Sequence, residues 1–519
     1  MNTLSKSKLI AFRQCPKRLW LEVHRPDLRA DSSATQASFS VGHTVGRVAR
    51  SLYDPEGQGC ELNREELGMD GLLSKTQELL SQRKPLFEAG FVSDAGGRAL
   101  ALADVLLPVG TVRSRQWRMV EVKSSTSVAD YHRDDVAIQH FVATQSGLKL
   151  SGVALAYVDR GWTYPGGENY QGLLVEEDLT AEAASRSGEV EGWISNAHQV
   201  VARKKPPKIE MGPQCSAPFE CGFFEHCTQE HEQVHGVTEY PVQWLPRVQT
   251  QALKNYIQGQ KVRSMAEVPD ELLNTVQLRV KRQTLANRVY FDASSAARDL
   301  AAFKLPAMFL DFETISFAVP IWAGTRPYQQ IPFQFSLHRV LRTGRTEHTG
   351  FLDVSGRDPS SAFVKALLAA CEGSAPIFVY NKGFEAGRIR ELATRFPRFA
   401  RQLMAIEARL VDLHPIAKNH FYHPAQLGSW SIKAVLPAIA PELDYADLEG
   451  VQDGGGAQAA FMEAVASETT ADRRRTLVAQ LWRYCRLDTF AMVRLWAHFS
   501  GRQDLVKPED DALSAGLPS

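Results

Sequence analysis

Two stretches decide the fold of the N-terminal half: Ala101-Leu-Ala-Asp-Val-Leu-Leu107 and Trp117-Arg-Met-Val-Glu-Val-Lys123. Both are apolar and read as strands joined by a turn. Residues two apart in a strand project from the same face, so Glu121 and Lys123 are expected to lie together. Asp104 can meet them from the neighbouring strand. The sequence therefore predicts an acid–lysine cluster on one sheet.

This cluster has the chemistry of phosphodiester hydrolysis. Asp104 and Glu121 can bind a hard cation such as Mg²⁺ through carboxylate oxygens. Lys123 can orient or polarise an attacking water and stabilise the charge that develops on a phosphate. A helix expected from Asp134 onward brings Gln139 to the same region. A lone Glu-x-Lys is common on exposed strands, and the ordered set of four residues favours a catalytic site.

Cysteines bracket the cluster. Cys15 lies near the N-terminus, and Cys215, Cys221 and Cys227 follow it with a C-x5-C-x5-C spacing. Three thiolates so close indicate one metal centre, which a fourth ligand would complete as a tetrahedral or cluster site. Zinc, an iron–sulfur cluster and unligated buried thiols all remain open at this point. The other three cysteines read as small core residues: Cys60, Cys371 and Cys485.

With these motifs, residues 1 to 232 resemble RecB-type nucleases of the PD-(D/E)xK superfamily. They are most similar to its iron–sulfur branch, which includes the CRISPR-associated exonucleases. The stretch Ser5 to Leu21 matches that branch's S-x-S-x-L-x-x-F-x-x-C-P-x-R-L-W-L opening. The resemblance implies a [4Fe–4S] cluster on Cys15, Cys215, Cys221 and Cys227, metal ligands at Asp104 and Glu121, and catalytic roles for Lys123 and Gln139.

The match has departures. The family places a metal-binding histidine four residues after a glycine in an early helix. Here Gly46 stands at that distance from Gly42, and His43 is out of register. The family's Q-x3-Y motif keeps its glutamine, but Ala143 replaces the tyrosine. Glu88 is a further carboxylate that an adjacent strand could add.

A second acid pattern begins in Leu305-Pro-Ala-Met-Phe-Leu-Asp-Phe-Glu-Thr314. This apolar strand ends in Asp311 and Glu313 on one face. Adjacent buried carboxylates are costly unless a cation compensates them. Glu385 follows another apolar strand, which ends near Tyr380.

The last part of this pattern is helical. Tyr484 and Asp488 are four residues apart and share a helix face. Four acids could hold two metal ions about 3.5–4 Å apart, with Tyr484 positioning or deprotonating the attacking water. The order D-x-E, N-x3-(D/E), Y-x3-D resembles the tyrosine subtype of the DEDD exonucleases, which have a ribonuclease H-like fold. The resemblance implies these metal ligands: Asp311, Glu313, Glu385 (where the family usually has aspartate) and Asp488.

Three further features of this half are ambiguous. Asp412 is either an accessory acid or a structural cap. The aromatic and basic stretch from Pro320 to His338 suits stacking on single-stranded bases or a folded loop with core aromatics. Lys433 follows a Gly-Ser-Trp-Ser-Ile element similar to one that precedes the last motif of such exonucleases, and it is a candidate phosphate contact.

Composition supports a globular α/β protein. The chain has 519 residues and zero formal net charge, which argues against coating nucleic acid by bulk charge and allows local basic channels. No run reaches the roughly 18 apolar residues of a membrane span, and a cytoplasmic location is expected. The expected organisation is a nuclease domain at 1–232, a helical connector at 233–303, an exonuclease domain at 304–503 and a flexible tail at 504–519.

The whole chain resembles a prokaryotic family that fuses these two nuclease types and whose C-terminal part is classed as a domain of unknown function. The expected activity is hydrolysis of DNA with a single-stranded end, using Mg²⁺ or Mn²⁺, with a helicase or a repair or defence protein as partner. One alternative keeps one active head and makes the other a nucleic-acid-binding platform. Another is a non-catalytic, redox-responsive nucleic-acid-binding protein.

Overall fold

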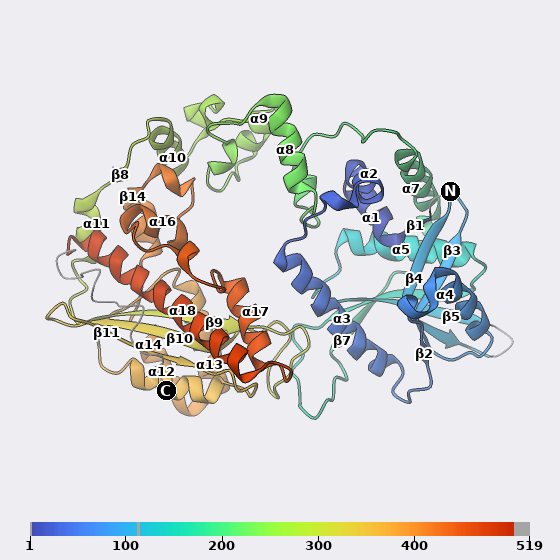
Figure 1. Cartoon of the computed structure of the whole chain (residues 1–519). Coiled ribbons are helices and arrows are strands. Elements are labelled where there is room, and N and C mark those ends of the chain that lie inside the picture. Colours follow the sequence, from blue (N-terminus) through green and yellow to red (C-terminus); the bar gives the residue numbers. More distant parts are fainter. Residues whose placement is uncertain (1–2, 112–114, 503–519) are drawn as a thin grey trace. The chain divides into compact units, whose positions relative to one another are not determined.

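The computed structural model describes residues 3–111 and 115–502, so the tail expected at 504–519 lies outside the described residues. The chain forms two compact units. Unit 1 contains the residues up to Val237 together with Phe317–Gln329, and unit 2 contains Thr238–Ser316 and the residues from Gln330 onward. Both units combine helices with a mixed sheet, which confirms the α/β class (Figure 1).

Unit 1 is built on a sheet with the order β2-β3-β4-β5-β6-β7, and β1 pairs with β4. Strand β4 is antiparallel to both of its neighbours, β3 and β5, whereas β5 and β6 are parallel. The strands are β1 (Leu4–Ser5), β2 (Cys60–Glu61), β3 (Leu86–Ser93), β4 (Ala99–Val109), β5 (Gln116–Lys123), β6 (Leu150–Val158) and β7 (Leu174–Asp178).

Helices cover both faces of this sheet. The main core lies under α5, where Ile138, Phe141 and Val142 are buried against apolar strand residues. A smaller apolar cluster includes Val105 and Val120, with Tyr53 at the end of α3 packed against it. The helices are α1 (Lys6–Gln14), α2 (Pro16–His24), α3 (Ser33–Tyr53), α4 (Arg64–Leu80), α5 (Asp130–Gln145), α6 (Thr180–Ser185), α7 (Ser187–Val201) and α8 (Phe224–His235), with 3-10 turns η1 (Pro26–Leu28) and η2 (Pro213–Cys215).

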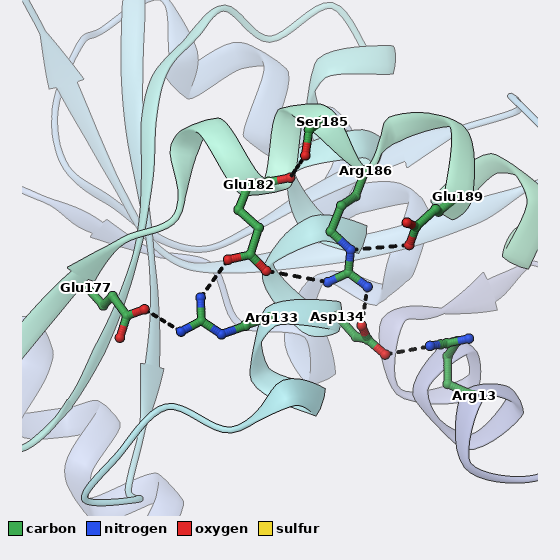
Figure 2. Close-up of polar contacts among 8 residues, drawn as sticks. All are labelled: Arg13, Arg133, Asp134, Glu177, Glu182, Ser185, Arg186 and Glu189. Carbon is green, nitrogen blue, oxygen red and sulfur yellow. Dashed lines mark hydrogen bonds and ion pairs between the residues drawn. The ribbon is translucent and has the colours of Figure 1, made fainter.

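An ion-pair network holds the start of α5 in place (Figure 2). Asp134 accepts from Arg186 at 2.5 Å and from Arg13 at 3.1 Å. Arg133 reaches the other way, to Glu182 at 2.6 Å and to Glu177 on β7. These contacts join α1, α5, α6 and β7, and they orient the helix that carries Gln139.

The segment Phe317–Gln329 belongs to unit 1, although it lies inside the range expected for the second domain. Ala318 and Val319 pack with Val45 and Val158 in a common apolar cluster. Backbone hydrogen bonds from Tyr164 to Thr325 (2.9 Å) and from Gly324 to Tyr164 (2.8 Å) hold the loop, and its Trp322 is buried. The structure therefore shows a folded loop with core aromatics at 317–329.

Unit 2 has a five-stranded sheet with the order β11-β10-β9-β12-β13. Strand β10 is antiparallel to both β9 and β11, while β9, β12 and β13 are parallel. Helix α18 packs on one face against β9 and β10, and α12 packs against β10 and β11 (Figure 1). The strands are β8 (Tyr290–Phe291), β9 (Ala307–Ile315), β10 (Ile331–Val340), β11 (Thr346–Leu352), β12 (Ile377–Val379), β13 (Leu410–Asp412) and β14 (Phe421–Tyr422).

The helices of unit 2 include a 30-residue helix, α18, whose N-terminus is capped by the Thr470 side chain. They are α9 (Gln251–Gly259), α10 (Thr275–Leu285), α11 (Ala293–Leu300), α12 (Ser360–Ala370), α13 (Gly383–Arg395), α14 (Ala400–Glu407), α15 (His414–His420), α16 (Ile432–Ile439), α17 (Gly454–Val465) and α18 (Ala471–Ser500). Short 3-10 turns are η3 (Val242–Trp244), η4 (Met265–Glu267), η5 (Asp270–Leu272), η6 (Pro397–Phe399), η7 (Pro424–Gln426) and η8 (Tyr445–Asp447).

The segment expected as a connector, 233–303, lies mostly within unit 2. Strand β8 pairs with β14, and α11 packs against α15 and α18. Its basic side chains hold the fold: Lys281 and Arg282 pair with Asp270, and Arg279 donates to the Lys418 carbonyl at 2.8 Å. Among the described helices, none combines the length and apolar character that a membrane span requires.

Candidate functional site

The structure brings the predicted acid–lysine cluster of unit 1 together at the end of β5. Glu121 is 2% exposed, and its Oε1 atom accepts hydrogen bonds from Lys123 Nζ and from Lys6 Nζ, each at 2.7 Å. Lys123 also forms an ion pair with Asp135 of α5. Lys6 and Asp135 were not predicted, because each reaches the cluster from a separate helix.

Asp104 and Gln139 complete this cluster. Asp104 lies on β4 one position beyond the Val105–Val120 pair, and its Oδ2 atom accepts the Val122 N–H at 2.8 Å. Gln139 Nε2 donates to Glu121 Oε2 and to the Leu102 carbonyl. The glutamine therefore orients the carboxylate from inside the core.

The lysines of this cluster determine the pKa of Glu121. Burial raises the pKa of Glu121, but Lys123 and Lys6 outweigh burial and hold that pKa below its ordinary value. Asp104 has a raised pKa because it is buried and faces the Glu121 charge. Burial opposes the charge of Lys123, yet Asp135 and Glu121 raise its pKa. The chain itself supplies the cations that this cluster needs.

A cleft of about 1180 Å³ opens onto these residues. One face of α3 lines it with Phe39, Gly42, His43, Gly46 and Arg47, which recur at helical spacing. A Cβ atom on Gly42 or Gly46 would meet no atom within 4 Å, so packing does not require either glycine. His43 lines the cleft, although it does not stand at the sequence position that the family pattern gives to its histidine.

Glu88 also lines this cleft, on β3. Its backbone φ is +59°, a left-handed conformation that is costly for a glutamate inside a strand. Burial and the neighbouring Glu121 raise the pKa of Glu88. A strained acid at this position adds a further carboxylate to Asp104, Glu121 and Asp135.

The four predicted cysteines line one small cavity of unit 1. Cys15 joins α1 to α2, Cys215 ends η2, Cys221 lies between η2 and α8, and Cys227 is on α8. Gln14 Nε2 ties the two regions by donating to the carbonyls of Gln214 (2.8 Å) and Phe219 (2.7 Å).

The surroundings of this cavity favour the neutral form of two of its thiols, Cys221 and Cys227. Burial raises the pKa of Cys221 and Cys227, although Arg18 and Lys17 respectively oppose the shift. A bound metal would have to displace those protons, because thiolates are the ligands. The donor set and its neighbouring cations fit a cysteine-ligated centre.

In unit 2 the structure gathers the second predicted set. Asp311 and Glu313 lie on β9, Glu385 in the first turn of α13, and Tyr484 and Asp488 on α18. Glu313, Glu385 and Asp488 are 8%, 1% and 6% exposed. The four acids meet because β9 is the central strand and α18 crosses it.

These acids gather without a salt bridge, and nearby bases only partly offset them: Lys433 opposes the rise in the pKa of Glu313 and Asp488, and Arg388 opposes that of Glu385. Burial raises the pKa of Asp311, and Asp488, Glu313 and Glu385 raise it further. Burial likewise raises the pKa of Glu313, the pKa of Glu385 to about 8 and that of Asp488 to about 6. None of the four forms a salt bridge within the described part of the chain. Such a cluster needs protons or a metal cation.

The structure adds two neighbours of this cluster that were not predicted. Tyr445 donates to Asp488 Oδ1 at 2.5 Å. The buried Cys485 thiol lies 3.8 Å from Asp311 Oδ2, and ligand atoms of Asp311, Glu313 and Cys485 all lie within 4.8 Å of one another. Cys485 was expected as a core residue, and the 3.6-residue helical period, by which Cys485 and Asp488 share a face, was the signal for its position.

Two other residues have clear structural roles. Asp412 accepts backbone N–H groups from Asn381, Lys382 and His414, each at 3.0 Å, so it acts as a cap. Lys433 Nζ donates to the Gln452 carbonyl at 2.6 Å and lies 5.1 Å from the ring centre of Tyr484. Lys433 therefore holds a loop over the acid cluster.

Comparison with known proteins gives one partial match. The family model of a domain of unknown function, DUF2779, matches residues 308–431. This range begins on β9 and includes Asp311, Glu313 and Glu385, and it ends before α18. No curated protein matches the chain.

Proposed function

We propose that this protein is a metal-dependent nuclease with two heads that hydrolyses phosphodiester bonds in nucleic acid, with DNA as the substrate to test first. The observation that carries the proposal is the convergence in unit 2 of four carboxyl groups with raised pKa values, which form no salt bridge within the described residues. Divalent metal ions relieve such repulsion and are the usual reason that proteins keep it.

The architecture of each unit supports the same proposal. In unit 2 the central β9 carries the D-x-E pair, and its neighbour β10 is antiparallel, an order that supports a ribonuclease H-like fold. In unit 1 the acid and lysine stand at the end of β5 with helices on both faces, which supports a PD-(D/E)xK fold.

The residues of unit 2 have separable roles. Asp311, Glu313, Glu385 and Asp488 would hold Mg²⁺ or Mn²⁺, which supplies water activation and charge stabilisation. Burial and the neighbouring acids raise the pKa of Tyr484, so its hydroxyl stays protonated and positions water through hydrogen bonds. In unit 1, Asp104 and Glu121 would hold the ion, Lys123 would orient water, and Gln139 would orient Glu121.

The cysteine cavity supports a structural [4Fe–4S] cluster on Cys15, Cys215, Cys221 and Cys227. It would tie the N-terminal helices to α8 and to the segment before α8, to which Gln14 already donates two hydrogen bonds. Anaerobic purification should give brown protein with about four irons, a Cys221→Ser variant should lose the iron, and Cys60→Ser should keep it. Stoichiometric zinc in the purified protein would contradict this assignment.

One observation favours a second candidate, a protein with a single active head. Lys6 and Lys123 both contact Glu121 Oε1, so two ammonium groups already offset the negative charge of Glu121 in unit 1. In this version unit 2 cleaves and the cleft of unit 1 binds nucleic acid.

Paired variants test both versions. The full chain is incubated with end-labelled single- and double-stranded DNA and RNA in Mg²⁺ or Mn²⁺. Glu121→Gln with Lys123→Ala, and separately Asp311→Asn with Glu313→Gln, should each remove a distinct set of products. If only the Asp311→Asn, Glu313→Gln variant loses products, the single-head version is favoured. If wild-type protein cleaves none of these substrates, the nuclease proposal is wrong.

A further inference from the structure

Unit 2 contains a second feature, a cleft of about 1070 Å³ beside the acid cluster. One wall is the segment from Gln243 to Thr250 with the first turn of α10. The other wall consists of Tyr380 and Asn381 after β12, residues of α15, and the loop that leads into α16. The segment expected as a connector therefore forms half of the cleft.

The two walls are fixed to each other. Gly428 has a φ of +78°, and a Cβ atom there would lie 1.7 Å from the Trp244 carbonyl oxygen, so only glycine permits this approach. Each wall is also held internally: Gln277 Nε2 donates to the Pro246 carbonyl at 2.9 Å in the first wall, and the Tyr380 hydroxyl donates to the Trp430 carbonyl at 2.6 Å in the second. The cleft is a built part of unit 2.

The cleft carries positive charge that no acid neutralises. Arg247 and Lys418 both line it, and neither forms a salt bridge within the part of the chain that the structure describes. The same positive charge acts on His414. Burial lowers the pKa of His414, Asp412 opposes this shift, and Lys418 and Arg247 lower the pKa further. Asp412, on the same side, has its oxygens engaged by backbone N–H groups.

Two segments of the second wall, the one with Tyr380 and Asn381 and the one that leads into α16, continue along the chain to residues at the acid cluster. Asn381, which lines the cleft with a φ of +76°, is followed in the next helix by Glu385. Ile432 also lines the cleft, and the next residue, Lys433, lies 5.1 Å from the ring centre of Tyr484. A chain bound in the cleft would therefore lie next to the acids.

Resting on the nuclease function proposed for unit 2, we propose that this cleft binds the phosphates of a single nucleic-acid strand and guides it to the acid cluster. Arg247 and Lys418 would contact the phosphates. Trp244 and Leu427, which is 47% exposed, offer apolar surface for bases. The volume is near that of pockets for small ligands, about 300–1,000 Å³, so a short single strand fits and a double helix does not.

The test is binding without turnover. The full chain is titrated against fluorescein-labelled oligo-dT and oligo-U of 12 nucleotides in EDTA, at several salt concentrations. Each phosphate contact on a single strand contributes about 0.7 to the slope of log K against log salt. Arg247→Gln with Lys418→Gln should therefore lower the slope by about 1.4 and weaken binding about tenfold or more. The control, Arg345→Gln with Arg401→Gln, makes the same charge change at exposed residues outside the cleft and should match wild type.

The outcomes separate this inference from the function on which it rests. If wild type cleaves DNA or RNA but the cleft variant keeps the slope and affinity of the control, the inference is wrong and the nuclease function stands. If wild type neither binds nor cleaves, both are wrong. Tighter binding of a blunt duplex than of a single strand would also overturn the inference. Should the cleft variant unfold, photo-crosslinking of wild type with 4-thiothymidine DNA decides: crosslinks at Trp244 or Tyr380 support the cleft, and crosslinks in unit 1 alone overturn it.

Discussion

The two acid clusters differ in what neutralises them. In unit 1, Glu121 is held by two lysines, and its pKa is lowered although it is buried. In unit 2, Asp311, Glu313, Glu385 and Asp488 face one another, and the pKa of each is raised. Both clusters contain residues suited to metal-dependent hydrolysis. The difference teaches that unit 1 is folded around internal ion pairs, whereas the acids of unit 2 form none within the described residues.

The largest expected effect tests the metal dependence of unit 2. Asp311→Asn with Glu313→Gln removes two oxygen ligands without changing side-chain size. Metal ions contribute several kcal/mol of transition-state stabilisation, so the cleavage rate of unit 2 should fall by about 10³-fold or more. Single-turnover cleavage of an end-labelled strand measures it. A loss of less than tenfold would show that these acids are not the ligands.

The next effect concerns stability, and its sign should differ between the units. Glu121→Gln leaves two buried lysines facing a neutral amide, so unit 1 should lose about 3 kcal/mol. Glu385→Gln replaces a carboxyl group whose charged form is disfavoured by burial, so metal-free unit 2 should keep or gain stability. Hydrogen-exchange protection of peptides from β5 and from α13 reports each unit separately. Equal destabilisation by both variants would remove the proposed distinction.

Glu385 of unit 2 and Glu121 of unit 1 should also contribute oppositely to the pH dependence of stability. Folded Glu385 has a pKa of about 8, well above about 4.3 for an unfolded glutamate, so the folded state binds the extra proton. Metal-free unit 2 should therefore lose stability as pH rises from about 4.5 to 8, by up to about 1.4 kcal/mol per pH unit for this group. The lowered pKa of Glu121 means that its contribution is lost only as pH falls below its unfolded value.

Protection of α13 peptides in EDTA at pH 5 and pH 8 measures this dependence. Mg²⁺ should reduce it, because metal binding favours the ionised acids, and Glu385→Gln should flatten it. A metal-free unit 2 that is equally stable at both pH values would contradict the unpaired-acid interpretation.

The smallest effect concerns Lys6. If its ammonium group competes with a metal ion for Glu121, Lys6→Met should raise the Mn²⁺ affinity of unit 1 by about tenfold, or about 1.4 kcal/mol. The measurement is Mn²⁺ titration by electron paramagnetic resonance in an Asp311→Asn, Glu313→Gln background. Lys8→Met, on the same helix, is the control. Unchanged affinity would mean that Lys6 supports Glu121 without competing.

Much of both sites could be predicted from local pattern. A strand period of two residues placed Glu121 and Lys123 together and paired Asp311 with Glu313, and a helical period paired Tyr484 with Asp488. These acids stand out in the sequence because each lies within a run of apolar residues. The order of strands could not be read this way, because it depends on pairing between distant segments.

Two of the unpredicted residues, Lys6 and Tyr445, lie far along the chain from the acids that they contact. Lys6 contacts Glu121 across 115 positions, and Tyr445 contacts Asp488 across 43. The Phe317–Gln329 loop packs in unit 1 although its neighbours in sequence belong to unit 2. No spacing rule connects such residues, because the contacts exist only after the sheets and helices have packed.

The sequence by itself determined which side chains could do chemistry and on which strand or helix each stands. It did so because backbone periodicity is local, and a buried acid leaves a visible pattern among apolar residues. Only the tertiary structure decided the charge state of each cluster and which segments wall the cleft of unit 2. A pKa depends on burial and on charged groups that tertiary packing brings near. For this reason one set of acids has salt bridges to lysines, and the other set has none within the described residues.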